Sequence, residues 1–350
     1  MPGERVDAFA PGRVNLIGEH TDYNEGLALP FAIAAGITVR AIATGDQRIR
    51  TRALDLGEED DFALADPSRA PGWRAFVRGV VAELQRAGFA LVGAELKISS
   101  DLALGAGLSS SAALEVALCL ALLGLAGAED VDRTDLARLC SRVETDWVGA
   151  QTGLLDQLAS LYGAPETALL IDFQTLALDP VPLALEGGWR LVLLDSGERH
   201  ANASSAYNER RAECARACEL LGVGSLREAR WDALERLPEP IRRRARHVLG
   251  ENDRVKDTVN ALRAGEPAAV GPLLNASHAS LRDQYEVSTP AVERAVAELL
   301  GAGAAGARIV GGGFGGQVLG LFAPGVGTPA HAREVRAGPG AHLLDGGGRH

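Results

Sequence analysis

Hydrophobic and polar positions alternate along several short segments of the first hundred residues, and this two-residue period predicts β-strands. Polar or glycine-containing turns separate these segments, which are VDAFA (6–10), GITVRAIAT (36–44) and AELKISS (94–100). The pattern then changes to a continuous apolar run at about 110–127, in which Glu115 is the one charged residue. Its longest uncharged apolar stretch, from Val116 to Ala128, is shorter than the roughly 18 to 20 residues that span a bilayer, so the run predicts a buried helix.

Helical periodicity returns after this run. A second helix is predicted over 135–147, where Leu136, Leu139, Cys140 and Val143 recur at spacings of three and four. Strands are predicted at 166–173 and 189–196. Amphipathic helices are predicted from there to about residue 300, and a glycine-rich strand and turn at 307–323.

The length of 350 residues predicts two domains with a cleft between them. The two prolines of LALDPVPLAL mark the expected boundary, which gives domains 1–175 and 176–350.

Composition and charge exclude several classes of protein. The net charge of −11 disfavours a nucleic-acid partner, because phosphate backbones require a basic face. We interpret the basic run Arg242, Arg243, Arg244 and Arg246 as a solvated helix face. The N-terminus lacks the apolar core of a signal peptide, so we expect a cytoplasmic protein with no membrane partner.

Cysteine and lysine usage narrows the chemistry further. The four cysteines form no C-x-x-C pair and no zinc-like grouping with histidine, so neither a disulfide nor a zinc site is predicted. Lysine occurs only at 97 and 256, and no G-x-x-x-x-G-K-[ST] motif exists. A P-loop route to ATP is therefore excluded.

The first candidate site is the segment APGRVNLIGEHTDYNEG. It places Arg13, Asn15, Glu19, His20 and Asp22 within ten positions, directly after an apolar strand. Glu, His and Asp within four residues offer donors and acceptors at several angles, as the many hydroxyls of a small polyol require. The alternative is a surface turn in which Asp22 merely caps the backbone.

The second candidate is the glycine-serine loop LGAGLSSSAAL at 104–114, which leads directly into the apolar helix. A helix start presents unpaired N–H groups and a partial positive charge, and glycines let the backbone approach a phosphate. The loop is therefore a candidate anion site, although a helix cap alone would also use one of its serines. Its expected nucleotide contacts are Gly105, Gly107, Leu108, Ser109, Ser110, Ser111 and Ala112.

Two carboxylates, Glu144 and Asp156, lie in VETDWVGAQTGLLDQL, across a glycine-containing interruption. Beside an anion loop they could serve as a metal ligand and a proton acceptor, whereas in isolation such residues are more often solvated.

The run GGGFGG at 311–316 satisfies G-x-G-x-x-G, but the apolar, strand-like QVLGLFA follows it where a dinucleotide fold requires a helix. A hairpin whose glycines pack closely against the serine loop or a phosphate is predicted instead.

Taken together, these motifs resemble the GHMP kinase superfamily, and GRVNLIGEHTDYNEG resembles the galactokinase signature itself. The resemblance implies an α+β, two-domain fold, with a mixed or antiparallel sheet packed with helices in each domain and the active site in the cleft. It implies ATP-dependent phosphorylation of the anomeric hydroxyl of α-D-galactose to galactose 1-phosphate, with Mg²⁺ as cofactor. A monomer or weak homo-oligomer is expected.

The same resemblance implies a role for each matching residue. Catalysis is expected of Asp156 as the proton acceptor and of Arg13 beside the reacting hydroxyl. Galactose would be bound by Glu19, His20, Asp22, Gly153 and Tyr207, with Arg199 ordering the site, and Mg²⁺ by Ser111 and Glu144.

Two other functions remain open at this point. A related sugar and ATP sensor would bind both ligands without turnover, although here GLSSSAAL, Arg13 and Asp156 are all present. Another sugar kinase of the same architecture would act on N-acetylgalactosamine or arabinose. Spacing does not separate these substrates, because the choice depends on the pocket around one hydroxyl.

Overall fold

A computed structural model describes residues 2–102, 107–128, 130–150, 153–199 and 203–344. Three sheets and eight α-helices are formed by these residues. The largest sheet has the order β13-β1-β3-β6-β4-β5, the second β10-β11-β9-β12 and the third β2-β7-β8. Their strands are β1 (Arg5–Asn15), β2 (Leu27–Ala28), β3 (Pro30–Ala43), β4 (Arg48–Ala53), β5 (Glu58–Ala63), β6 (Ala94–Ser100), β7 (Thr167–Asp172), β8 (Ala177–Pro182), β9 (Arg190–Arg199), β10 (Gly306–Ile309), β11 (Gly315–Phe322), β12 (Arg333–Val335) and β13 (His342–Leu343).

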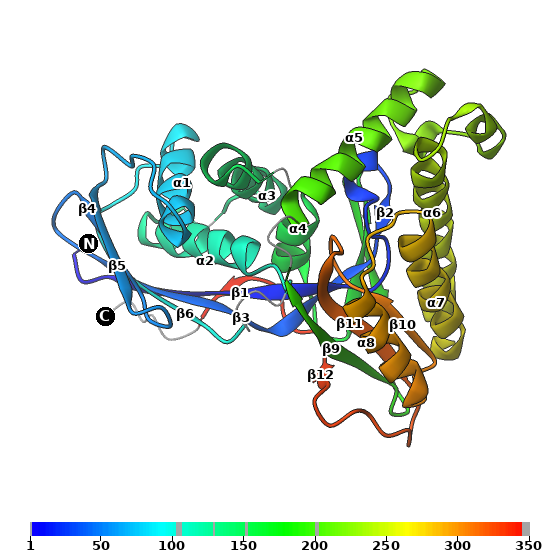
Figure 1. Ribbon diagram of the computed structural model, residues 1–350. Coiled ribbons are helices and arrows are strands. Elements are labelled where there is room, and N and C mark those ends of the chain that lie inside the picture. The colour runs from blue at the N-terminus through cyan, green and yellow to red at the C-terminus, as the bar shows by residue number, and fades with distance from the viewer. Residues whose placement is uncertain (1, 103–106, 129, 151–152, 200–202, 345–350) are drawn as a thin grey trace.

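Helices cover one face of the largest sheet (Figure 1). The helices of the chain are α1 (Trp73–Arg86), α2 (Ser110–Leu125), α3 (Arg133–Arg142), α4 (Leu155–Tyr162), α5 (Ala203–Leu221), α6 (Ile241–Arg263), α7 (Pro267–Asp283) and α8 (Pro290–Gly301). Helix α2 packs on β1 and β3 and is buried almost throughout, as its apolar sequence predicts. It forms the centre of the first hydrophobic core.

A second hydrophobic core lies among β9, β10 and β11 and the helices α5, α6 and α8. The mixed and antiparallel sheets packed with helices, with two separate cores, agree with the predicted α+β class. The division at residue 175 stays a prediction. Near the C-terminus, β13 returns to pair with β1, so the last described strand completes the first sheet.

Two local predictions differ from the structure. The helix expected over 135–147 ends at Arg142, and a π-helical segment continues from Val143 to Val148. π-Helical segments within or beside α-helices are frequent at functional sites. The basic run is also only partly solvated, because Arg244 is 1% exposed and pairs with Glu213 and Glu286.

No helix of the described part of the chain is both long and apolar enough to cross a membrane.

Candidate active site

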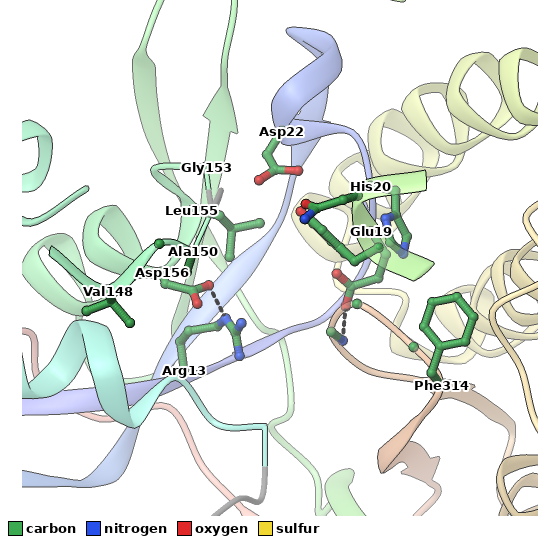
Figure 2. Close-up of a pocket in the computed structure, with 16 residues that line it drawn as sticks. Arg13, Glu19, His20, Asp22, Val148, Ala150, Gly153, Leu155, Asp156 and Phe314 are labelled. Atoms are coloured by element: carbon green, nitrogen blue, oxygen red, sulfur yellow. Dashed lines mark hydrogen bonds and ion pairs between the residues drawn. The ribbon is translucent and has the colours of Figure 1, made fainter. Parts of the chain in front are cut away.

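A cavity of about 530 Å³ opens where the end of β1, the start of α4, the start of α5 and the β10–β11 turn meet (Figure 2). This volume is typical of small-molecule sites. All the residues predicted to act in catalysis or sugar binding line the cavity, namely Arg13, Glu19, His20, Asp22, Gly153, Asp156 and Tyr207.

Arg13 and Asp156 face each other on one side of the cavity (Figure 2). Arg13 Nε donates to Asp156 Oδ1 at 2.7 Å, although the two residues are 143 positions apart. A shift in the register between β1 and β3 separates Pro11 from Arg13, and such a bulge changes the direction of the side chain that follows it. Asp156 is the second residue of α4, where the partial positive charge of the helix start stabilises a carboxylate.

The serine loop contacts this pair directly. Gly12 brings β1 so close to the loop that a side chain at this position would meet the Leu108 carbonyl oxygen at 2.6 Å. Arg13 Nη1 also donates to the Gly107 carbonyl at 2.9 Å. Ser109 Oγ donates to Asp156 Oδ2 instead of capping α2, so the serine hydroxyl links the helix start to the carboxylate.

The beginning of α2 is thereby left without a side-chain cap. Ser110, Ser111 and Ala112 are the first three residues of the helix, and their N–H groups precede the first intrahelical bond, from Ala113 to Ser109. The segment has the features of an anion site. Of the predicted nucleotide contacts, Gly105 lies outside the described residues.

Glu19 is buried on the opposite side of the cavity, in the loop after β1. Its Oε1 accepts a hydrogen bond from the Gly311 N–H at 2.7 Å. Burial raises the pKa of Glu19, whereas the positive charge of Arg308 and the Gly311 N–H lower it.

His20 lies beside Glu19 with positive φ and a buried ring. Burial, followed by the neighbouring His247, lowers the pKa of His20 to about 3, so the imidazole is neutral at physiological pH. Nδ1 lies 2.9 Å from the Tyr23 hydroxyl, and Nε2 has no hydrogen-bond partner among the described residues. An unmatched, buried nitrogen at a cavity wall is suited to a polar ligand.

Asp22 is held close to Gly153. A side chain at Gly153 would overlap the Asp22 carboxylate, so the glycine leaves room for the carboxylate in its present position. Burial, together with the charges of Asp156 and Glu19, raises the pKa of Asp22 to about 6. The carboxylate is therefore close to half protonated at mildly acidic pH.

Tyr207 contributes from the first turns of α5. Its ring centroid lies 5.3 Å from that of His20 and 5.6 Å from that of Tyr23, and the tyrosine ring is also adjacent to Gly312. Tyr207 and His20 line the cavity, and the apolar face of a sugar ring could pack against the tyrosine ring. The side chain of Arg199 lies outside the described part of the chain.

The glycine run forms the predicted hairpin between β10 and β11. Its turn packs through Gly311 and Gly312 against Tyr207 and against residues 16–27, which follow β1 and are called the sugar-signature loop. Within the described residues, these glycines contact the sugar-signature loop and Tyr207 and not the serine loop, and the alternative contact with a phosphate stays a prediction.

Glu144, the predicted metal ligand, is buried in the π-helical segment. Gln157 Nε2 donates to its Oε2 at 3.1 Å and is 3.5 Å from Glu115 Oε2. Burial, followed by negative neighbours that include Glu144, raises the pKa of Glu115 well above its usual value. No group of three or more His, Cys, Asp or Glu side chains suited to a metal ion occurs within the described ranges.

Sequence reasoning missed the helix that supports the sugar-signature loop. Three side chains of α6 bind its backbone: Glu251 accepts from the Gly18 N–H, His247 contacts the Glu19 carbonyl and Asn252 accepts from the Leu27 N–H. They lie 225 or more positions from the loop, in a helix whose basic sequence indicates a solvated face. Asn208 and Phe314 also line the cavity, although neither was predicted as a site residue.

Three family models match the chain. GHMP kinases N terminal domain matches residues 75–164, Galactokinase galactose-binding signature matches 3–42, and GHMP kinases C terminal matches 258–339. The chain is similar to a galactokinase of Mycobacterium tuberculosis, with 45% identity over 322 residues that cover 90% of this chain and 88% of the relative. A galactokinase of Streptomyces coelicolor is 41% identical, covering 89% and 82%.

Solved structures give the same picture. The Lactococcus lactis galactokinase complexed with galactose superimposes with a TM-score of 0.90 at 34% identity, covering 97% of this chain and 95% of the other. The Methanococcus jannaschii mevalonate kinase superimposes with a TM-score of 0.70 at 17% identity, covering 96% and 98%, and shows the shared fold.

Proposed function

The chain belongs to the galactokinases within the GHMP kinase family, and we propose that it transfers the terminal phosphoryl group of ATP to the anomeric hydroxyl of galactose. One observation carries the proposal. The Arg13–Asp156 pair lies at the junction between the serine-loop helix start and the cavity that Glu19, His20 and Asp22 line. A phosphoryl acceptor and a phosphoryl donor could meet at this junction.

The reaction proceeds by direct transfer. Asp156 takes the proton of the anomeric hydroxyl, the hydroxyl oxygen forms a bond to the terminal phosphorus, and the bond from that phosphorus to the bridging oxygen breaks to release ADP. Arg13 is bonded to Asp156 Oδ1 and is only 8% exposed. Its fixed charge orients the carboxylate and offsets negative charge on the phosphoryl group in transit.

The nucleotide binds at the start of α2. Because Ser109 points to Asp156, the N–H groups of Ser110, Ser111 and Ala112 are left to bind phosphate oxygens. Gly107 and Leu108 would lie next to the phosphates, since their carbonyls already anchor Arg13 and its backbone. Ser109 thus couples the phosphate site to the proton acceptor.

The residues present fit a Mg²⁺ ion that arrives with the nucleotide. Mg²⁺ in phosphoryl-transfer sites is held by one or two protein oxygens together with phosphates and water, so a three-ligand protein cage is not required. Glu144 is buried beside a second carboxyl group, Glu115, whose ionised form burial and the negative charge of Glu144 disfavour, and a nearby cation would offset this repulsion. Ser111 and Glu144 would hold the ion, which supplies neutralisation of phosphate charge when bound.

Galactose binds in the cavity through hydroxyl donors and acceptors. Glu19 and Asp22 accept from its hydroxyls, while the neutral His20 presents the unmatched Nε2. Gly153 leaves space for Asp22, and Tyr207 packs on the sugar ring. Several polar contacts to one small ligand give discrimination, because a sugar lacking one hydroxyl leaves a buried partner unmatched.

The protein acts in the cytoplasm, as a monomer or weak homo-oligomer. All four cysteines are free, and Cys119 and Cys140 remain unbonded although their sulfur atoms lie only 3.8 Å apart. Unbonded neighbouring cysteines fit a reducing compartment. Light scattering coupled to size exclusion would measure the oligomeric state.

A coupled ADP-release assay with ATP and Mg²⁺ tests the function. We expect turnover with galactose and much weaker turnover with N-acetylgalactosamine or arabinose. Galactose binding without ADP release would identify a sensor and refute the proposal. Preferred turnover of another sugar in the panel would retain the kinase reaction and refute the assigned substrate.

A further inference from the structure

Arg308 on β10 is a fully buried arginine that contacts the sugar-signature loop without lining the cavity. Its Nη1 donates to the carbonyl oxygens of Asn15 and Leu16, both at 3.0 Å. These carbonyls stand at the end of β1, three to four residues before Glu19. Arg308 therefore fixes the backbone from which the loop departs, although it lies nearly 300 positions away in sequence.

The same guanidinium is turned towards the Glu19 carboxylate. Arg308 Nη2 lies 3.4 Å from Glu19 Oε1, the oxygen that also accepts the Gly311 N–H. Nε and Nη2 have no hydrogen-bond partner among the described residues. A buried guanidinium in this state is costly unless an anion stands nearby. In the described part of the chain, Glu19 is the acidic side chain within 4 Å of it, and the buried carboxylate of Glu251 compensates its charge from further away.

Arg308 in turn stabilises the ionised form of Glu19. Burial raises the pKa of Glu19, and the charge of Arg308 is the strongest of the neighbouring influences that lower it. The ionised carboxylate is the form that accepts hydrogen bonds from hydroxyl groups at full strength. Arg308 thus favours the state of Glu19 that a sugar would require.

We propose that Arg308 is a positioning residue for sugar binding, which holds the loop backbone through Asn15 and Leu16 and the Glu19 carboxylate through Oε1. The carboxylate is then presented to a hydroxyl donor of the sugar without further ordering. This inference rests on the proposed function, because it names a support of the same site. Arg308 acts through Glu19 and has no contact with the reacting atoms.

A double-mutant cycle tests the inference on the full chain. The galactose dissociation constant is measured by titration calorimetry for the unmodified protein, Arg308→Gln, Glu19→Gln and the double variant. We expect each single change to weaken binding about 10- to 100-fold, as when a charged hydrogen-bond partner is lost. The dissociation constant of the double variant should exceed that of the more weakly binding single variant by no more than about 3-fold, because both changes disrupt the same Arg308–Glu19 interaction.

Controls separate positioning from general stability. Arg244→Gln removes an arginine of similar burial, 1% exposed and paired with Glu213 and Glu286. It should lower the melting temperature and leave the galactose dissociation constant unchanged. Arg308→Lys keeps the charge but cannot bind two carbonyls and a carboxylate together, so it should give intermediate affinity. It replaces Arg308→Gln in the cycle if that variant does not fold.

The inference is overturned if the affinity losses of the two single variants multiply in the double variant. It is also overturned if a folded Arg308→Lys variant binds galactose with unchanged affinity. The proposed function fails on a different measurement, since the unmodified protein would then release no ADP with galactose in the coupled assay, whether or not it binds the sugar. An unmodified protein that binds no galactose at all is a third outcome. That result would remove both proposals, whereas galactose binding with independent effects of Arg308 and Glu19 removes this one alone.

Discussion

Replacing Asp156 with asparagine would separate the chemistry of the site from its architecture. The amide oxygen of asparagine can still accept from Arg13 Nε, which lies 2.7 Å from Asp156 Oδ1. The amide has nearly the shape of the carboxylate, so the start of α4 and the contact with Ser109 should persist. The variant loses the negative charge and the ability to take a proton from the sugar.

The size of the effect follows from these two consequences. Loss of a general base lowers the rate of the chemical step by about 10²- to 10⁴-fold, which corresponds to about 3 to 5 kcal/mol of transition-state stabilisation. The effect on stability should be much smaller. The two side chains are only 10% and 21% exposed, but the amide keeps the hydrogen bond from Arg13, so the loss is the difference between a charged and a neutral acceptor, about 1 kcal/mol. We therefore expect kcat to collapse while the melting temperature falls by a few degrees at most.

The assay measures ADP release at saturating galactose and ATP, with galactose affinity determined separately by calorimetry. Asp172→Asn is a matched control, because Asp172 pairs with Arg227 at 3.0 Å and the two side chains are similarly exposed, at 23% and 21%. That variant should keep full turnover. An Asp156→Asn protein that retains kcat within about tenfold of the unmodified enzyme would refute the assignment of Asp156 as proton acceptor.

Three further predictions concern the residues around this pair. Because burial raises the pKa of Asp22 to about 6, its ionised fraction falls below that pH, and the galactose KM should rise there; Asp22→Asn should abolish this dependence. Gly153→Ala should displace Asp22 and weaken galactose binding about 10- to 100-fold, with a smaller change in the ATP KM. Burial opposes ionisation of Glu251, yet the charge of Arg254 lowers its pKa to about 2. The stability that it contributes is complete above about pH 4.5 and is lost towards pH 2, so the difference in melting temperature between the unmodified protein and Glu251→Gln should narrow as the pH falls from about 5 to about 3.

The cavity residues could be predicted because they lie in short motifs with an unusual density of polar side chains. The segment from Arg13 to Asp22 is one example, and the GLLDQ segment that contains Asp156 is another. Periodicity alone could not have placed them together, since nothing in the spacing relates two residues 143 positions apart. The resemblance to a known family provided that link.

The residues that support these motifs were hidden for a physical reason. Glu251 and His247 occur in a charged helix whose composition indicates solvent exposure, but both are fully buried against the sugar-signature loop. A buried polar residue becomes visible in a sequence only if its partner is known, and here the partners are backbone groups that any sequence possesses. The π-helical segment at Glu144 was missed similarly, because apolar spacing continues through it.

The distribution of charge supports the proposal that the two substrates bind on different sides of the Arg13–Asp156 pair. On the cavity side, Glu19, Asp22 and Asp156 face a neutral His20, so the surface is rich in acceptors and repels phosphate. On the other side, uncapped N–H groups at the start of α2 attract it. In the proposed mechanism a neutral polyol therefore enters the acidic cavity, and the triphosphate approaches from the helix start. Arg13 lies between them and carries the positive charge that the phosphoryl group meets as it crosses.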